Sequence, residues 1–136
     1  MEIVLARPPM FDEIDAVFHV AGKPVIFTWG NTIYNPEGCT VSPALKAHES
    51  VHAQRQTNDD RQIRSWWERY LLDPQFRYAE ELAAHRAEYR AFKSWTKDRN
   101  ELAQRLHQIA GRLSGPLYGG VASYTEARRS IAADRG

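Results

Sequence analysis

Residues 48–52 constrain this chain more than any other segment, because the chemistry that they spell out works only on a helix. They read His-Glu-Ser-Val-His, the pattern H-E-x-x-H. Histidines at positions i and i+4 of a helix lie one turn apart on the same face, so the imidazoles of His48 and His52 can reach one zinc ion. The carboxylate of Glu49 points beside such an ion, where it can take a proton from an activated water and pass it to a leaving amine. The segment therefore predicts a helix that carries a metal site.

The sequence around this motif favours a helix. Ser42 stands at a position typical of an N-cap, and Pro43 follows at the first helical position, where its missing N–H removes no hydrogen bond. The next residues are good helix formers, and the pattern continues to Gln56 before the polar residues 57–60 interrupt it. We therefore predict a helix of about 14 residues from Pro43 to Gln56. The alternative is a surface helix that carries two histidines and a glutamate without binding metal.

A zinc site also needs a third protein ligand, with one position left open for water. The metzincin extension of the motif requires Gly at position 55 and His at position 58, but Arg55 and Asn58 stand there. The inverted order H-x-x-E-H is absent from the sequence as well. A glutamate from a second helix remains as the source of the third ligand.

A second helical segment begins at Asp73-Pro74 and offers such a glutamate. Its apolar residues recur at helical spacing, and Glu81 and His85 fall within this apolar stripe, whereas Glu80 is predicted on the polar side. Carboxylates are almost never fully buried unless they are paired or bind metal. We therefore predict Glu81 as the third zinc ligand, against the alternative that it pairs with an arginine at the edge of the core.

The other candidates in this segment keep open roles. Glu80 and Glu88 compete with Glu81 as the third ligand. His85 follows Glu81 by about one helical turn and can reach the same site. We expect His85 to pack in the core or to form a hydrogen bond to a ligand carboxylate.

These motifs resemble the gluzincin branch of the zincin metallopeptidases, in which a glutamate from the next helix joins the H-E-x-x-H histidines. The likeness is closer to small single-domain zincin-like proteins of bacterial and tailed-phage genomes. It covers roughly residues 24–92: a strand segment at 30–36 leads into the motif helix, and an E-x-x-A segment at 81–84 follows a Trp- and Tyr-rich stretch at 66–70. The resemblance implies that zinc is bound by His48, His52 and Glu81, with Glu49 as general base.

Composition and charge limit the class of protein. The chain has 136 residues, 43% hydrophobic and 26% charged, which is typical of one globular domain over residues 1–136. A net charge of +1 gives no concentrated positive field for nucleic acid. The single cysteine, Cys39, allows no intramolecular disulfide. The sequence has no apolar run long enough for a membrane span and no secretory signal pattern, so we expect a cytoplasmic protein.

The remaining segments predict a mostly helical domain. Residues 9–20 have helical spacing, while the β-rich runs 25–29 and 32–34 predict a hairpin. Asp98 and Ser123 each begin a capping-box pattern, which predicts two further helices. We therefore predict an α+β fold: a mostly helical, minimal zincin-like domain with a small antiparallel strand pair beside the motif helix.

The favoured function is that of a zinc-dependent hydrolase, a small metallopeptidase that acts on a peptide or protein substrate with Glu49 as general base. Zincins often place a Tyr, His or Arg near the substrate oxygen, and Tyr118, Tyr124 and His107 are the candidates here. One alternative is a non-catalytic zincin-like protein in which zinc is structural and the domain binds a protein partner. Another is a helical nucleic-acid-binding module that uses the arginines in the middle of the chain.

Overall fold

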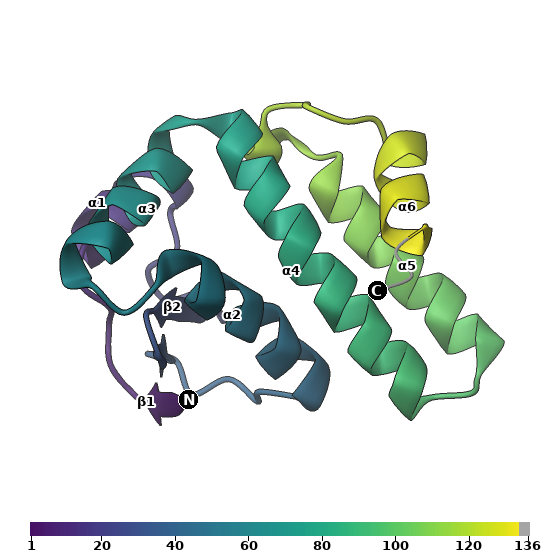
Figure 1. The fold of residues 1–136 in the computed structure, drawn as a ribbon, viewed down its shortest axis with the longest axis horizontal. Helices are drawn as coiled ribbons and strands as arrows, with labels where there is room; N and C mark the ends of the chain where they lie inside the picture. Colours follow the sequence, from purple (N-terminus) through teal and green to yellow (C-terminus); the bar gives the residue numbers. More distant parts are fainter. Residues whose placement is uncertain (134–136) are drawn as a thin grey trace.

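One long helix separates the two halves of this protein. The computed structural model describes residues 1–133. In chain order the elements are β1 (Glu2–Val4), α1 (Phe11–Phe18), β2 (Phe27–Trp29), β3 (Thr32–Tyr34), α2 (Pro43–Gln56), α3 (Asp60–Leu72), α4 (Pro74–Trp95), α5 (Arg99–Leu113), a short 3-10 helix (Pro116–Tyr118) and α6 (Tyr124–Ala132). The sheet and helices α1 to α3 lie on one side of α4, and α5 and α6 lie on the other (Figure 1). The predicted mostly helical α+β fold is confirmed.

Helix α2 carries the H-E-x-x-H motif, and it has the predicted bounds. The Oγ atom of Ser42 accepts a hydrogen bond from the backbone N–H of Leu45 at 3.1 Å, and Pro43 opens the helix. The helix ends at Gln56, because Thr57 adopts a φ of 66° and leaves the helical region. The predicted helix over residues 43–56 is confirmed.

The sheet has one strand more than the sequence predicts. Strands β2 and β3 pair in antiparallel fashion, which confirms the hairpin. Gly30 makes the turn with a φ of 58°, and a Cβ there would lie only 2.9 Å from Cδ1 of Ile63. Strand β1 pairs in parallel with β3, so the strand order is β1-β3-β2. The strand pair is therefore part of a three-stranded mixed sheet, because three residues are too few to show an alternating pattern.

Two apolar clusters lie on the two sides of α4. The first joins the sheet to α1 and α3 and contains Phe11, Ile14, Phe27, Trp29, Ile63, Trp66, Trp67 and Leu71. The second joins α5, α6 and the 3-10 helix and contains Leu106, Ile109, Ala110, Leu113, Tyr118, Ala127 and Ile131.

Helix α1 is shorter than predicted, and the last two helices begin where they were predicted. Met10 and His19 adopt φ values of 60° and 54°, so left-handed residues bound α1 on both sides and the predicted range 9–20 is too long. Asp98 and Ser123 cap α5 and α6 through their side chains. Among the described residues, no helix combines the length and the apolar character that a membrane span requires.

Candidate metal centre

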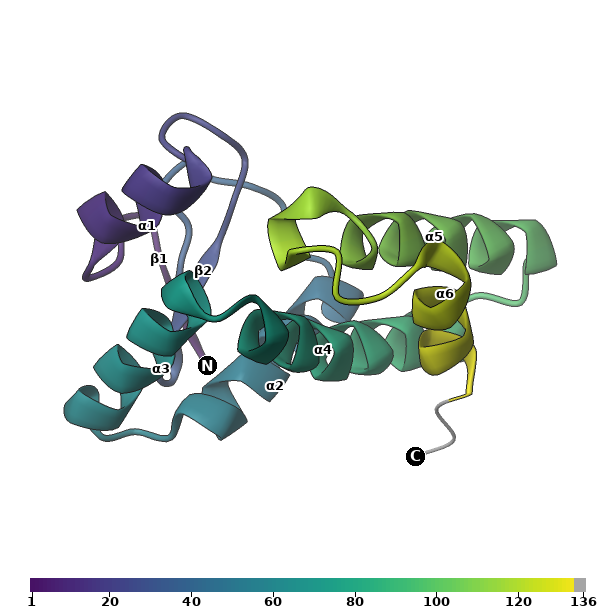
Figure 2. The same cartoon turned by 90° about the horizontal axis from the view of Figure 1, so that it is seen from above.

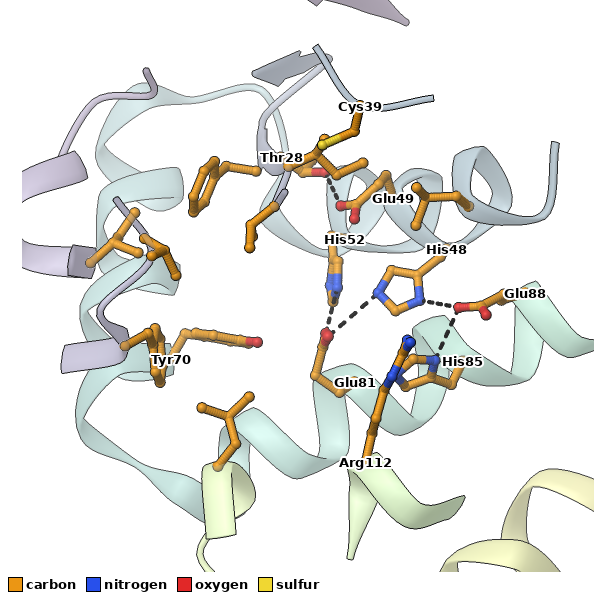
Figure 3. A pocket seen from close by; sticks show the side chains of 18 of the residues that line it. Thr28, Cys39, His48, Glu49, His52, Tyr70, Glu81, His85, Glu88 and Arg112 are labelled. Atoms are coloured by element: carbon orange, nitrogen blue, oxygen red, sulfur yellow. Dashed lines mark hydrogen bonds and ion pairs between the residues drawn. The ribbon is translucent and has the colours of Figure 1, made fainter. Parts of the chain in front are cut away.

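Three buried side chains from α2 and α4 converge on one point. Nε2 of His48 lies 3.4 Å from Oε1 of Glu81, and Nε2 of His52 lies 2.7 Å from Oε2 of the same carboxylate. Both imidazoles face Glu81, which extends toward them from α4 (Figure 3). The exposed fractions of His48, His52 and Glu81 are 6%, 5% and 6%. The structure thus brings together the three residues predicted as ligands in a group that could hold a metal ion.

The arrangement of these atoms fits a zinc ion. Zinc bonds of 2.0–2.2 Å in a tetrahedral site place neighbouring ligand atoms about 3.3 Å apart. The separation between His48 and Glu81 is close to this value, and that between His52 and Glu81 is shorter. The shorter contact falls outside hydrogen-bond geometry, and Oε2 of Glu81 has no hydrogen-bond partner within residues 1–133. Two nitrogens and a carboxylate oxygen form a donor set that zinc accepts.

The charges at the site keep Glu81 ionised. Burial alone would raise the pKa of Glu81, but His52 and His48 lower it well below its usual value. Burial alone would lower the pKa of His48, but the carboxylates of Glu81 and Glu88 raise it well above its usual value. An ionised Glu81 offers a cation a full negative charge at a buried position.

Glu88 orients His48 from behind. Its Oε1 atom lies 2.9 Å from Nδ1 of His48 and 3.0 Å from Nδ1 of His85, and its Oε2 atom accepts a hydrogen bond from Arg105 at 3.2 Å. A hydrogen bond from Nδ1 fixes the imidazole so that Nε2 faces Glu81 and His52. Burial would raise the pKa of Glu88, but its bonds to His48 and His85 lower it.

Glu88, which was predicted as an alternative third ligand, therefore has a different position from Glu81. Together with His48 and His85 it forms a second group whose spacing could hold a metal ion. Its two contacts have the lengths of N–H···O hydrogen bonds and use Nδ1 of each ring, which leaves Nε2 of His48 for the first group. His85 is buried, as one of its two expected roles requires, but its hydrogen bond goes to Glu88 and not to the candidate ligand Glu81.

Glu49 lies beside the three candidate ligands, and β2 holds it there. Its Oε2 atom accepts a hydrogen bond from the hydroxyl of Thr28. The backbone carbonyl of Thr28 in turn accepts hydrogen bonds from Gln56 at 2.9 Å and from Trp67 at 3.1 Å. These bonds attach β2 to α2 and α3, so they fix the distance between Glu49 and the strand. Thr28 was not predicted, because a threonine in a β-rich run carries no signal of its partner.

The predicted position of Glu80 is wrong. The helical pattern placed it on the polar side of α4, yet its exposed fraction is 3%. It forms an ion pair with Arg55 and accepts a hydrogen bond from Nε1 of Trp66 at 2.6 Å. Helices α2 and α3 cover this side of α4, so a helix that looked amphipathic is enclosed on more than one side. Glu80 belongs to neither group of candidate ligands.

A cavity of about 590 Å³ opens beside the candidate ligands. Tyr118 and Tyr70 line it. Burial and the carboxylate of Glu81 raise the pKa of both tyrosines, so both hydroxyls stay protonated and can donate a hydrogen bond. Of the three candidates for contact with the substrate oxygen, Tyr118 lies in the cavity wall. Tyr124 and His107 contact each other at 2.7 Å on the exposed surface.

Tyr70 was not predicted to contribute to the site. It follows the two tryptophans of α3 at helical spacing, which is the pattern of an ordinary core residue. In the structure it lies on the cavity side of α3, on the opposite side of Glu81 from Arg112 (Figure 3).

No family model, no curated protein and no solved structure matches this chain.

Proposed function

We propose that this chain is a zinc-dependent hydrolase, a small metallopeptidase in which His48, His52 and Glu81 bind zinc and Glu49 is the general base. The proposal is supported above all by the position of Glu49, a buried carboxylate that faces the same cavity as the three ligands and is not one of them. Zinc in such a site supplies a Lewis acid that polarises a carbonyl group and makes water more acidic.

Side chains around the cavity carry out the other steps of the proposed reaction. Glu49 takes a proton from the attacking water and returns it to the leaving amine, and Thr28 holds the carboxylate in place for both transfers. Tyr118 keeps its hydroxyl proton and donates a hydrogen bond to the substrate oxygen as negative charge develops there. Glu88 holds His48 in the orientation that ligation requires.

The first test exchanges Glu49 for glutamine. The amide cannot accept the proton, so Glu49→Gln should lower the rate of peptide cleavage by at least about 100-fold. Zinc content, measured by elemental analysis, should stay at about one ion per chain. Cleavage is measured on a peptide library by mass spectrometry of the new termini. The matched control is Glu68→Gln, the same exchange at an exposed position of α3, which should leave the rate unchanged.

The alternative function predicts a different result in the same experiment. If zinc is structural and the domain binds a partner, chelation should unfold the protein and no peptide should be cleaved. Cleavage that survives Glu49→Gln would also contradict the proposal, because Glu49 would not be the base. A protein that stays free of metal after incubation with zinc would exclude both functions.

A further inference from the structure

Arg112 is a cation of the cavity that has no carboxylate partner among residues 1–133. It extends from α5 toward Glu81 and His85 (Figure 3), and it lines the cavity. Within residues 1–133 its guanidinium forms no hydrogen bond and no ion pair, and its positive charge acts on the hydroxyl of Tyr118, whose pKa it lowers. Arg105, on the same helix, differs in this respect, because it pairs with Glu88 and lies over the ring of Phe92. The guanidinium of Arg112 is therefore available to a ligand.

The charge of the cavity favours an anionic ligand. Three cationic residues, Lys23, Arg105 and Arg112, line it together with the three carboxylates Glu49, Glu81 and Glu88. These charges cancel, so a divalent zinc ion leaves the loaded cavity positive. A guanidinium presents a planar pair of N–H donors, which matches a carboxylate in two parallel hydrogen bonds. The group that fits Arg112 best is thus a free carboxylate.

The part of the cavity near α1 is mostly apolar. Helix α1 lies at one end of the molecule, whereas α5 begins at the opposite end and runs back toward α1 (Figure 2); Arg112 is the second-to-last residue of α5. Near α1 the wall includes Ile14, Phe18 and Val25, together with the exposed Lys23 of the loop that follows α1. Tyr70 lies on one side of Glu81 and Arg112 on the other (Figure 3). A ligand that spans the metal site thus has an apolar part toward Tyr70 and Phe18 and an anionic part toward Arg112.

We propose that the substrate is a peptide whose last residue is removed, and that Arg112 binds the free C-terminal carboxylate. This inference rests on the proposed function and names its substrate class. The bond that breaks is the amide between an apolar residue and the C-terminal residue. One water is consumed: the carbonyl carbon gains a hydroxyl group, the C–N bond breaks, and the nitrogen leaves as an amine with the proton that Glu49 returns. The products are a shortened peptide and a free amino acid.

The experiment compares two probes that differ only at the C-terminus, N-acetyl-leucyl-phenylalanine and its C-terminal amide. We expect the zinc-loaded protein to cleave the acid with a kcat/KM at least about 10-fold higher than the amide, the value of a hydrogen bond to a charged group. Arg112→Gln should remove this preference, so that the acid is cleaved no faster than the amide. Arg112→Lys should restore part of it. The matched control Arg99→Gln, at an exposed position of α5, should keep the preference.

A binding measurement separates this inference from the proposed function. Zinc-loaded Glu49→Gln should bind the acid at least about 10-fold more tightly than the amide in calorimetry, and the added Arg112→Gln exchange should abolish the difference. If the acid binds in this Arg112-dependent way but is never cleaved, the carboxylate site stands and the hydrolase proposal fails. If both probes are cleaved equally, or if Arg112→Gln slows both alike in a folded protein, the inference is overturned and the hydrolase stands. Failure of both probes to bind also overturns it.

Discussion

The two faces of α4 are buried by opposite means. Toward α5 and α6 the helix contributes Tyr78, Leu82 and Tyr89 to an apolar cluster. Toward α2 it contributes ionisable side chains to a layer that is just as inaccessible to water, here called the polar layer, which consists of His48, Glu49, His52, Glu81, His85 and Glu88. Burial of apolar surface stabilises the fold directly, whereas burial of charge stabilises it only as far as partners replace the lost hydration. The apolar face of α4 thus accounts for the stability of the fold. The buried charges of the polar layer are better explained by a function than by stability.

One of the unpaired atoms of the polar layer lies at the candidate metal site. Glu88 has three partners, and Glu49 has Thr28. Among the buried side-chain atoms of residues 1–133, those without a hydrogen-bond partner are Nδ1 of His52 and Oε2 of Glu81. Oε2 of Glu81 faces Nε2 of His52, so an ion at the candidate site would supply the interaction that this oxygen lacks, whereas Nδ1 of His52 is the ring nitrogen that does not face Glu81.

The largest effect should come from the apolar face. Leu113→Ala removes a fully buried side chain of α5 and leaves a cavity, so the free energy of unfolding should fall by about 2–5 kcal/mol. Zinc affinity of the folded protein should not change, since Leu113 belongs to the other face. Urea denaturation at a fixed excess of zinc measures the first quantity, and calorimetry the second. Leu72→Ala is the matched control, because Leu72 is 82% exposed and should cost little. Weaker zinc binding by a folded Leu113→Ala protein would show that the two faces are coupled.

A substitution at the ligand position of the polar layer should instead change zinc affinity. Glu81→Ala should weaken zinc affinity by at least about 10-fold, or about 1.4 kcal/mol. The matched control is the neighbouring Glu80→Ala, which removes the partner of Arg55 and of the buried Trp66 N–H. That change should lower the free energy of unfolding by about 1–3 kcal/mol and leave zinc affinity nearly unaltered. If Glu80 or Glu88 proves to be the residue on which zinc binding depends most, the assignment of Glu81 as ligand is wrong.

This contrast also explains which features the sequence can predict. Helix α2 is encoded locally, because Ser42 and Pro43 define its start and the histidine spacing fixes its face. The convergence of Glu81 on that face follows from a simple rule, that a carboxylate on an apolar stripe needs a partner. Local patterns of this kind need no knowledge of the neighbouring elements.

The features that were missed depend on contacts between distant segments. Glu80 was assigned to the polar side because its pairing with Arg55 spans 25 positions and its burial depends on α3. The bond between Glu88 and His48 spans 40 positions and has no signature in either helix. Strand β1 exists because β3 offers it an edge. Arg112 lies in the cavity because α5 folds back along α4, which periodicity alone cannot predict.

The smallest expected effect comes from removing one capping hydrogen bond at the start of a helix. It tests whether the two faces of α4 are independent. Ser123 caps α6 through a complete capping box with Glu126, far from the polar layer. Ser123→Ala should lower the free energy of unfolding by about 1 kcal/mol and leave zinc affinity unchanged. Ser42→Ala removes a similar cap from α2, which carries both candidate histidine ligands, so it should cost about the same in stability. Equal losses in urea denaturation, with any change in zinc affinity confined to Ser42→Ala, would locate metal binding in the α2 side of the molecule. A change of zinc affinity in Ser123→Ala would instead mean that α6 supports the metal site through α4.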